Sequence, residues 1–89
     1  MAPEAWEDKP MTKKSDIWSL GVVLYELCVQ KYPFIAQTID ELQVKVQREK
    51  YAPIPQTVNK QFCEIIQKCL MKKPENRPSI EEIIFSENF

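Results

Sequence analysis

Apolar side chains recur at helical spacing in four stretches of the chain, and prolines separate these stretches. The third stretch, residues 58–71, has the clearest pattern, because its apolar positions fall three or four residues apart and line one face of a helix. The strict alternation that marks a half-buried strand is missing from the sequence. The pattern therefore predicts an all-α fold.

The first predicted helix covers residues 16–30. Ser15 is its expected N-cap, and Asp16 puts a negative charge in the first turn, where the helix dipole favours it. Ten of the thirteen residues 17–29 are apolar and cover every face, so protein must surround this helix. A chain of 89 residues can scarcely supply that cover. An ordinary core helix of a small bundle is one interpretation, and we favour the other, a helix from a larger fold.

The remaining three helices are expected to start at capping residues. The second begins after Thr38, with Glu41 completing a capping box, and ends near residue 49. Thr57 is the expected N-cap of the third helix. Ser79 caps the short fourth helix and Glu82 closes its capping box. The isoleucines of this helix are expected to face inward: Ile80, Ile83 and Ile84.

Composition excludes several classes of function. Twelve basic and thirteen acidic residues give a net charge of −1, which offers no electrostatic footprint for nucleic acid or an anionic membrane. Histidine is absent, and with it the commonest general base and zinc ligand. A single glycine cannot build a phosphate-binding glycine-rich loop. We therefore expect no catalytic residue, cofactor site or metal site in this chain, and neither a nucleic-acid nor a membrane partner.

The cysteines indicate the compartment. Cys28, Cys63 and Cys69 are odd in number and lack C-x-x-C spacing, which argues against a disulfide scaffold and against a zinc site. The sequence also shows no basic-then-apolar signal pattern at its start. We expect an intracellular protein, cytoplasmic or nuclear.

Three motifs follow one another along the chain. Ala2-Pro3-Glu4 comes first, D-I-W-S-L-G-V-V-L-Y-E-L follows at residues 16–27, and N-R-P-S stands at residues 76–79. In this order they resemble the closing part of the C-lobe of a eukaryotic Ser/Thr protein kinase, whose signature set includes A-P-E. Within the kinases, the stretches 15–27, 50–55 and 77–83 are similar to the NIMA-related group. The resemblance covers residues 1–89 and implies a partial kinase domain with the helical C-lobe fold.

The resemblance also implies an activity for a complete parent protein. Such a kinase transfers the γ-phosphoryl group of ATP to protein Ser or Thr with the help of magnesium. The glycine-rich loop, the strand lysine, the His-Arg-Asp loop and the Asp-Phe-Gly site of the family would all precede Met1. The 89 residues are then a structural fragment, predicted inactive, whose partners are the missing N-terminal part of the domain or the parent's protein substrates. The alternatives are a non-catalytic, kinase-derived helical interaction module and a non-functional truncation product.

The resemblance assigns structural roles to individual residues. It implies a buried ion pair between Glu4 and Arg77 that ties the A-P-E segment to the last helices. It implies that Asp16 supports the catalytic loop in the parent, whereas in this chain a simple first-turn charge is the favoured role. A glycine inside a helix costs about 1 kcal/mol of stability relative to alanine, so its presence needs a structural reason. At Gly21 the expected reason is the close approach of another backbone. The scaffold of the central helix is expected to include Trp18, Leu20, Gly21 and Leu24.

Overall fold

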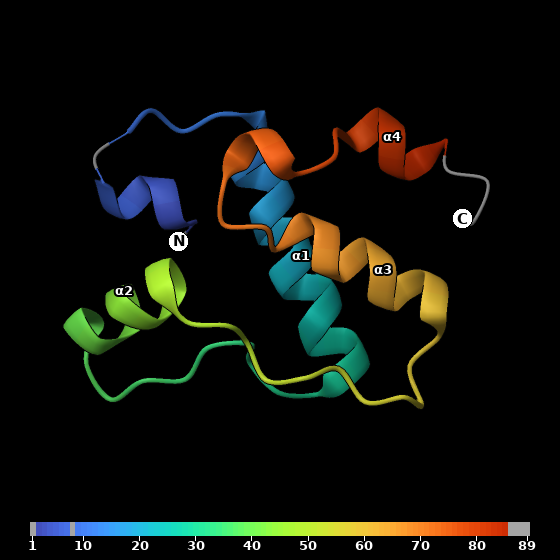
Figure 1. The fold of residues 1–89 in the computed structure, drawn as a ribbon, viewed down its shortest axis with the longest axis horizontal. Helices are drawn as coiled ribbons and strands as arrows, with labels where there is room; N and C mark the ends of the chain where they lie inside the picture. Colours follow the sequence, from blue (N-terminus) through green and yellow to red (C-terminus); the bar gives the residue numbers. More distant parts are fainter. Residues whose placement is uncertain (1, 8, 86–89) are drawn as a thin grey trace.

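The computed structural model describes residues 2–7 and 9–85, and within these ranges it contains helices and no strand (Figure 1). The predicted all-α fold is thus confirmed. Met1 and residues 86–89, which the kinase resemblance includes, lie outside the described residues. The elements, in chain order, are the 3-10 helix η1 (Pro3–Glu7), α1 (Lys13–Val29), α2 (Ile39–Arg48), α3 (Lys60–Cys69), the 3-10 helix η2 (Pro74–Asn76) and α4 (Ile80–Ile84).

Helix α1 begins three residues earlier than the sequence predicted. Its N-cap is Thr12, whose Oγ1 accepts a hydrogen bond of 3.2 Å from the backbone N–H of Lys14. Ser15, the predicted cap, lies inside the first turn, and its Oγ accepts a bond of 3.1 Å from the Thr12 N–H. The prediction was wrong because two polar residues three positions apart form one capping box, and the earlier one is the cap. At the other end Gln30 takes a left-handed conformation with φ 62°.

The start of α2 at Thr38 is confirmed, since Thr38 Oγ1 accepts a bond of 3.1 Å from Glu41 N–H. The second bond of the predicted capping box would run from Thr38 N–H to the Glu41 carboxylate. The carboxylate instead accepts from Gln37 N–H at 3.3 Å. The predicted cap of α3 was wrong: Asn59, not Thr57, caps this helix, with Oδ1 accepting from the N–H of the second helical residue at 2.8 Å. Thr57 instead lies in the turn that precedes Asn59.

Helix α4 has the predicted capping box but not the predicted inward face. Ser79 and Glu82 exchange both bonds of the box, at 3.1 and 3.4 Å. Of the three isoleucines only Ile83 is buried, whereas Ile80 and Ile84 are 43% and 58% exposed. The three positions share one side of this short helix, but only Ile83 reaches a core cluster, whereas Ile80 borders a cavity between α1 and α4.

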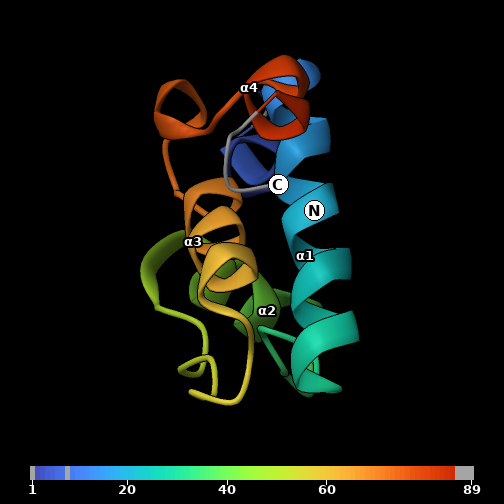
Figure 2. The same ribbon diagram turned by 90° about the vertical axis from the view of Figure 1, so that its right-hand side faces the viewer.

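Helices α1 and α3 lie side by side and form the centre of the molecule (Figures 1 and 2). Gly21 is buried where they meet, and a Cβ added there would lie 2.7 Å from the Cβ of Cys69 and 3.0 Å from Cδ2 of Leu70. The two helices therefore pack at a distance that leaves no room for a side chain at position 21. Helix α2 packs against η1, and its Val46 reaches the core beside this pair.

The core consists of two clusters of buried side chains on either side of this contact. The larger cluster contains Ala2, Trp18, Tyr25, Val46, Ile66 and Leu70. The smaller contains Ile17, Ile65, Cys69 and Ile83. Leu24 packs against both, so α1 joins the two clusters.

The described part of the chain leaves the outer face of α1 partly uncovered. Figure 2 shows α1 along one edge of the molecule, with α2 and α3 on the same side of it. Val23 and Leu27 on this helix are 52% and 70% exposed. The fold is only 16 Å thick along its shortest axis, so it cannot enclose a helix that is apolar on every face. Among the described residues, no helix combines the length and apolar character needed to cross a membrane.

Candidate functional site

Glu4 in η1 and Arg77 after η2 form an ion pair in the protein interior. Arg77 Nη1 donates to Glu4 Oε2 and Arg77 Nη2 donates to Glu4 Oε1, both at 2.8 Å. The two side chains are 5% and 0% exposed. This two-pronged arrangement uses the planar fork of the guanidinium, which a lysine cannot reproduce.

The remaining donors of Arg77 bind backbone carbonyl groups. Its Nε donates to Met71 O at 2.8 Å, Nη1 donates to Lys14 O at 2.8 Å, and Nη2 donates to Lys72 O at 3.1 Å. Together with the two bonds to Glu4, these contacts use all five N–H groups of the guanidinium. A fully bonded cation can be buried at moderate cost, so this geometry explains how Arg77 lies in the core.

The carboxylate of Glu4 has a third donor. Ser15 Oγ donates to Glu4 Oε2 at 2.7 Å while accepting from Thr12 N–H, so the start of α1 is tied directly to η1. Burial alone would raise the pKa of the Glu4 carboxyl. Hydrogen bonds from Arg77 and Ser15, with the charge of Arg77, outweigh burial and lower this pKa to about 2. Glu4 is therefore ionised at neutral pH.

A layer of cations and aromatic rings extends from the pair toward α2. The guanidinium carbon of Arg77 lies 5.1 Å from the ring centroid of Trp18, and the Trp18 ring is stacked near Phe34 at 6.2 Å between centroids. Lys72 Nζ lies 4.5 Å from the Phe34 centroid and donates to Val46 O at 2.5 Å. These contacts are of the cation–π type. They connect the ion pair to the C-terminal half of α2.

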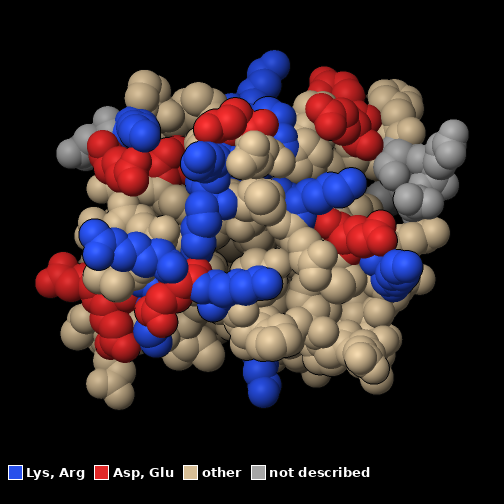
Figure 3. Space-filling view, viewed as in Figure 1, with Lys and Arg blue, Asp and Glu red and all other residues tan. Residues whose placement is uncertain are grey.

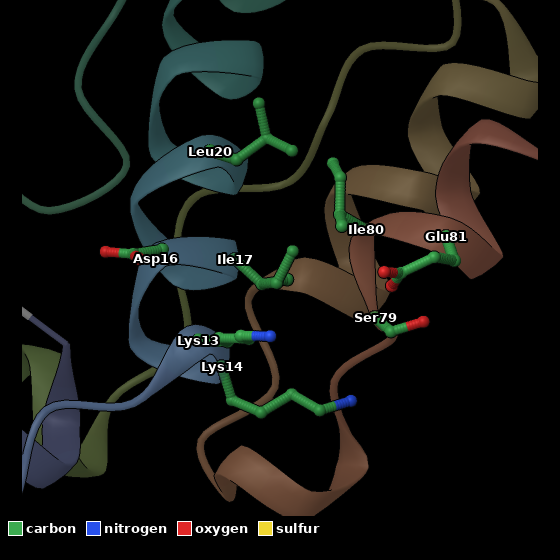
Figure 4. Close-up of a pocket in the computed structure, with 8 residues that line it drawn as sticks. All are labelled: Lys13, Lys14, Asp16, Ile17, Leu20, Ser79, Ile80 and Glu81. Carbon is green, nitrogen blue, oxygen red and sulfur yellow. The ribbon is translucent and has the colours of Figure 1, made fainter.

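The structure does not bring Asp16 into this cluster. Asp16 is exposed in the first turn of α1 and, within the described ranges, makes no side-chain hydrogen bond or ion pair. It lines a cavity of about 400 Å³ between α1 and α4, and Figure 4 shows its carboxylate directed away from the middle of that cavity. Ile17, Leu20 and Ile80 point into the same cavity (Figure 4). The cavity is therefore mainly apolar, with charged residues at its rim.

The other scaffold residues lie along α1 as a helix places them. Trp18 is buried against the ion pair, and Gly21 is buried against α3. Leu24 packs between the two core clusters, whereas Leu20 packs against the smaller cluster and borders the cavity. These four positions thus have different neighbours, and it is Trp18 whose ring lies against the guanidinium of Arg77.

Sequence reasoning missed three polar contributors to this site. Ser15 was interpreted as a helix cap and is a ligand of Glu4. No contact was predicted from the sequence for Lys14 or Lys72, whereas Lys14 Nζ donates to Arg77 O and Lys72 Nζ donates to Val46 O, each at 2.5 Å. The spacing of Thr12 and Ser15 was a usable signal for the capping box. For the lysines the sequence held no signal, because their acceptors are backbone groups 63 and 26 positions away.

The geometry is that of a structural site. Within residues 2–7 and 9–85, no three Cys, Asp or Glu side chains are grouped so that they could hold a metal ion. The central carboxylate is buried and accepts three hydrogen bonds, and a base that a substrate cannot reach is poorly placed for proton transfer. What the arrangement does is fix η1, the start of α1 and the segment 71–77 relative to one another.

Known proteins match the chain over almost its whole length. A family model described as protein tyrosine and serine/threonine kinase matches residues 1–86. The putative serine/threonine-protein kinase A of Trypanosoma brucei brucei is 42% identical over 83 residues, which make up 93% of this chain and 19% of that protein. Serine/threonine-protein kinase Nek2 of Homo sapiens is 43% identical over 84 residues, 94% of this chain and 19% of Nek2.

A third relative is the G2-specific protein kinase nimA of Emericella nidulans, which is 36% identical over 84 residues, 94% of this chain and 12% of nimA. The predicted resemblance to Ser/Thr kinases, with the NIMA-related group among them, is confirmed by these matches. The chain spans only about a fifth, or less, of the length of these relatives.

Proposed function

The chain belongs to the protein tyrosine and serine/threonine kinase family, and on that basis we propose that residues 1–89 are a partial kinase domain whose own role is structural. The fragment holds the helices of the C-lobe together. Transfer of the γ-phosphoryl group of ATP to protein Ser or Thr, with magnesium, belongs to a complete parent protein. This division agrees with the small share of each relative that the chain spans.

The uncovered face of α1 carries this proposal. Asp16, Leu20, Val23 and Leu27 stand four, three and four residues apart and so share one face of the helix. Val23 and Leu27 are 52% and 70% exposed, although burying a side chain of this size stabilises a protein by roughly 1.5–3 kcal/mol. A helix with this pattern is built to be covered by further protein. The missing N-terminal part of the kinase domain is the proposed occupant.

Asp16 has a place in this proposal because it stands at the N-terminal end of the uncovered face. Its carboxylate is exposed and has no partner in the described part of the chain. A carboxylate in that position can accept backbone N–H bonds from a segment that crosses the start of α1. We assign it that role in the parent, where the crossing segment is the catalytic loop.

The Glu4–Arg77 pair holds the A-P-E segment in place. Glu4 belongs to η1, and Arg77 is bonded to two carbonyls that precede η2 and to one at the start of α1. In the parent, the A-P-E segment ends the activation segment, so this pair anchors one end of a regulated loop. Protein substrates of the parent contact that loop and are partners of the parent only.

An intracellular location, cytoplasmic or nuclear, is part of the proposal. Cys28, Cys63 and Cys69 are all free. Reduced thiols persist in reducing compartments, which supports this assignment.

Self-association of the chain tests the proposed role of α1. We expect the 89-residue chain to associate in sedimentation velocity experiments, because Val23 and Leu27 remain uncovered. The double variant Val23→Lys, Leu27→Lys should shift it toward the monomer. A matched control is Ile39→Lys on α2, which is 71% exposed and outside the α1 face. Association of the α1 variant to the same extent as the control would show that this face is not a contact surface.

A phosphotransfer assay tests the assigned inactivity. The purified chain, incubated with radiolabelled ATP, magnesium and a generic protein substrate, is expected to transfer no label above the buffer blank. The expectation follows from the single glycine and absent histidine, which leave no phosphate-binding loop and no His-Arg-Asp base. Transfer that persists through stringent purification and disappears in the Arg77→Ala variant would assign catalysis to the chain itself.

A further inference from the structure

A hollow of about 530 Å³ lies between the end of α2 and the segment that follows α3. Figure 3 shows Lys and Arg side chains gathered around a depression on this face of the molecule. The hollow is separate from the uncovered face of α1, since α1 lies at the back of this view (Figure 2). A ligand bound in this hollow therefore leaves the uncovered face of α1 free.

Cations dominate the lining of this hollow. Arg48, Lys50, Lys72 and Lys73 border it, and among the described residues Glu49 is the only acidic one that does. The chain as a whole carries a net charge of −1, so this concentration of positive charge is local. Within the described ranges none of the four cations forms an ion pair, because the acidic partners of other lysines and of Arg77 lie elsewhere. Four unpaired cations around one depression leave their charge available to a ligand.

The positive charge of Lys72 is only partly compensated inside the protein. Its ammonium donates to Val46 O at 2.5 Å and lies 4.5 Å from the Phe34 ring, and both are neutral groups. Burial lowers the pKa of Lys72 to about 8, and the nearby charge of Glu49 offsets that effect only in part. A bound anion would supply the missing charge.

The neutral groups in the hollow define what else the ligand needs. Gln67 and Asn76 offer side-chain amide groups, which can donate to oxygen atoms. Leu70, Met71 and Tyr51 supply an apolar wall. The combination of clustered cations, amide donors and an apolar wall fits a phosphoryl group that is attached to a chain with apolar side chains.

We propose that this hollow is a binding site for a phosphorylated segment of a partner protein. The phosphate dianion lies among the four cations, where its oxygens accept charge-assisted hydrogen bonds. An apolar side chain next to the phosphorylated residue packs on the wall formed by Leu70 and Met71. A dianion suits this lining better than a single carboxylate, because the lining has an excess of three positive charges.

Isothermal titration of the full chain with three probes tests the proposal. The probes are a capped pentapeptide with one phosphoserine between two leucines, the same peptide with serine, and inorganic phosphate. We expect the phosphopeptide to bind about tenfold or more tightly than either other probe, and its affinity to fall as salt is added. In the same complex, NMR of the lysine side chains should show the pKa of Lys72 rising, because the anion stabilises the ammonium.

Two conservative variants locate the site. Arg48→Gln and Lys73→Gln remove exposed charges and should each weaken phosphopeptide binding about fivefold. Lys60→Gln removes an exposed charge at the start of α3, away from the hollow, and should change the affinity for the phosphopeptide less than about twofold. Equal binding of the serine peptide, equal binding of free phosphate, or equal losses in the variants and the Lys60 control would each overturn the proposal. A Lys72 pKa that stays unchanged in the complex would overturn it as well.

Discussion

The guanidinium of Arg77 meets the carboxylate of Glu4 in two hydrogen bonds of 2.8 Å, although 73 positions separate the two residues in the sequence. Because both side chains are buried, the pair joins the two ends of the chain in one interior contact. Ser15 binds the same carboxylate, and three backbone carbonyls bind the same guanidinium. The pair is thus the centre of a network, and its energetic weight can be measured.

We predict that Arg77→Ala destabilises the chain by roughly 3–5 kcal/mol, because it leaves the Glu4 carboxylate buried without its partner. Arg77→Lys should recover only part of this loss, since an ammonium cannot make the two parallel bonds. A double-mutant cycle with Glu4→Ala, measured by urea unfolding, gives the coupling energy of the pair.

The exposed pair Glu7–Lys9 provides a matched control in the same molecule. Its side chains are 50% and 66% exposed and lie 3.1 Å apart. A cycle on this pair should give about 0.5 kcal/mol or less. A Glu4–Arg77 coupling in that same low range would mean that the buried pair contributes no more than a surface contact.

The free energy of unfolding should depend on pH through the ionisation of the Glu4 carboxyl. The pKa of this carboxyl is about 2 in the folded chain against an ordinary value of 4.5. A carboxyl with a depressed folded-state pKa stabilises the fold fully above about pH 4.5, and the contribution disappears as the pH falls through about 2. We expect the difference in unfolding free energy between the wild type and Glu4→Gln to shrink over this interval. Parallel pH profiles for the two proteins would contradict the assignment.

The fold class followed from the sequence because helical patterns depend on local spacing. The periodic apolar positions of residues 58–71 and the cap at Ser79 were enough to predict helices there. The positions of the caps at Thr12 and Asn59 were missed, since several polar residues in a row compete for that role. Local chemistry therefore predicts that a helix exists more reliably than where it begins.

The ion pair was inferred from a family resemblance and not from the residues themselves. Nothing near Glu4 or Arg77 in the sequence indicates that they meet, because the contact spans almost the whole chain. The bonds from Arg77 to Met71, Lys14 and Lys72 use backbone oxygens, which are identical at every residue. No sequence pattern can predict such acceptors. The hollow beside Lys72 was not predicted either, because its cations come from segments that are far apart in the chain.

Gly21→Ala should destabilise the chain, although alanine is the better helix former. The helix propensity favours alanine by about 1 kcal/mol. The added Cβ would lie 2.7 Å from the Cβ of Cys69, however, and separating α1 from α3 costs about 1–3 kcal/mol or more. Thermal unfolding should show a lower Tm for this variant.

Two further variants separate the clash at Gly21 from other effects. Ser19→Ala lies on the exposed side of the same helix and should change stability by less than about 0.5 kcal/mol. Cys69→Gly removes the atom that the new Cβ would meet, so Gly21→Ala should cost less in that background. An equal cost in both backgrounds would place the effect somewhere other than the contact between α1 and α3.

The three cysteines should differ in reactivity. Cys69 is fully buried, and burial raises the pKa of its thiol to about 11, although the charge of Arg77 partly opposes this. Cys28 and Cys63 are half-buried. The thiolate is the reactive form, and a thiol pKa raised from 9 to about 11 lowers the thiolate population at neutral pH by about 100-fold. Alkylation followed by mass spectrometry should therefore modify Cys28 and Cys63 well before Cys69.

The rate at Cys69 should also report on the Glu4–Arg77 network. A thiol that is buried between α1 and α3 reacts only when these helices separate, so its rate follows the free energy of opening. Arg77→Ala should accelerate alkylation of Cys69 strongly while leaving Cys28 nearly unchanged, because only the first thiol depends on opening of the core. Modification of Cys69 as rapid as that of Cys28 in the wild-type chain would show that α1 and α3 separate freely, and the proposed structural role of the network would then fail.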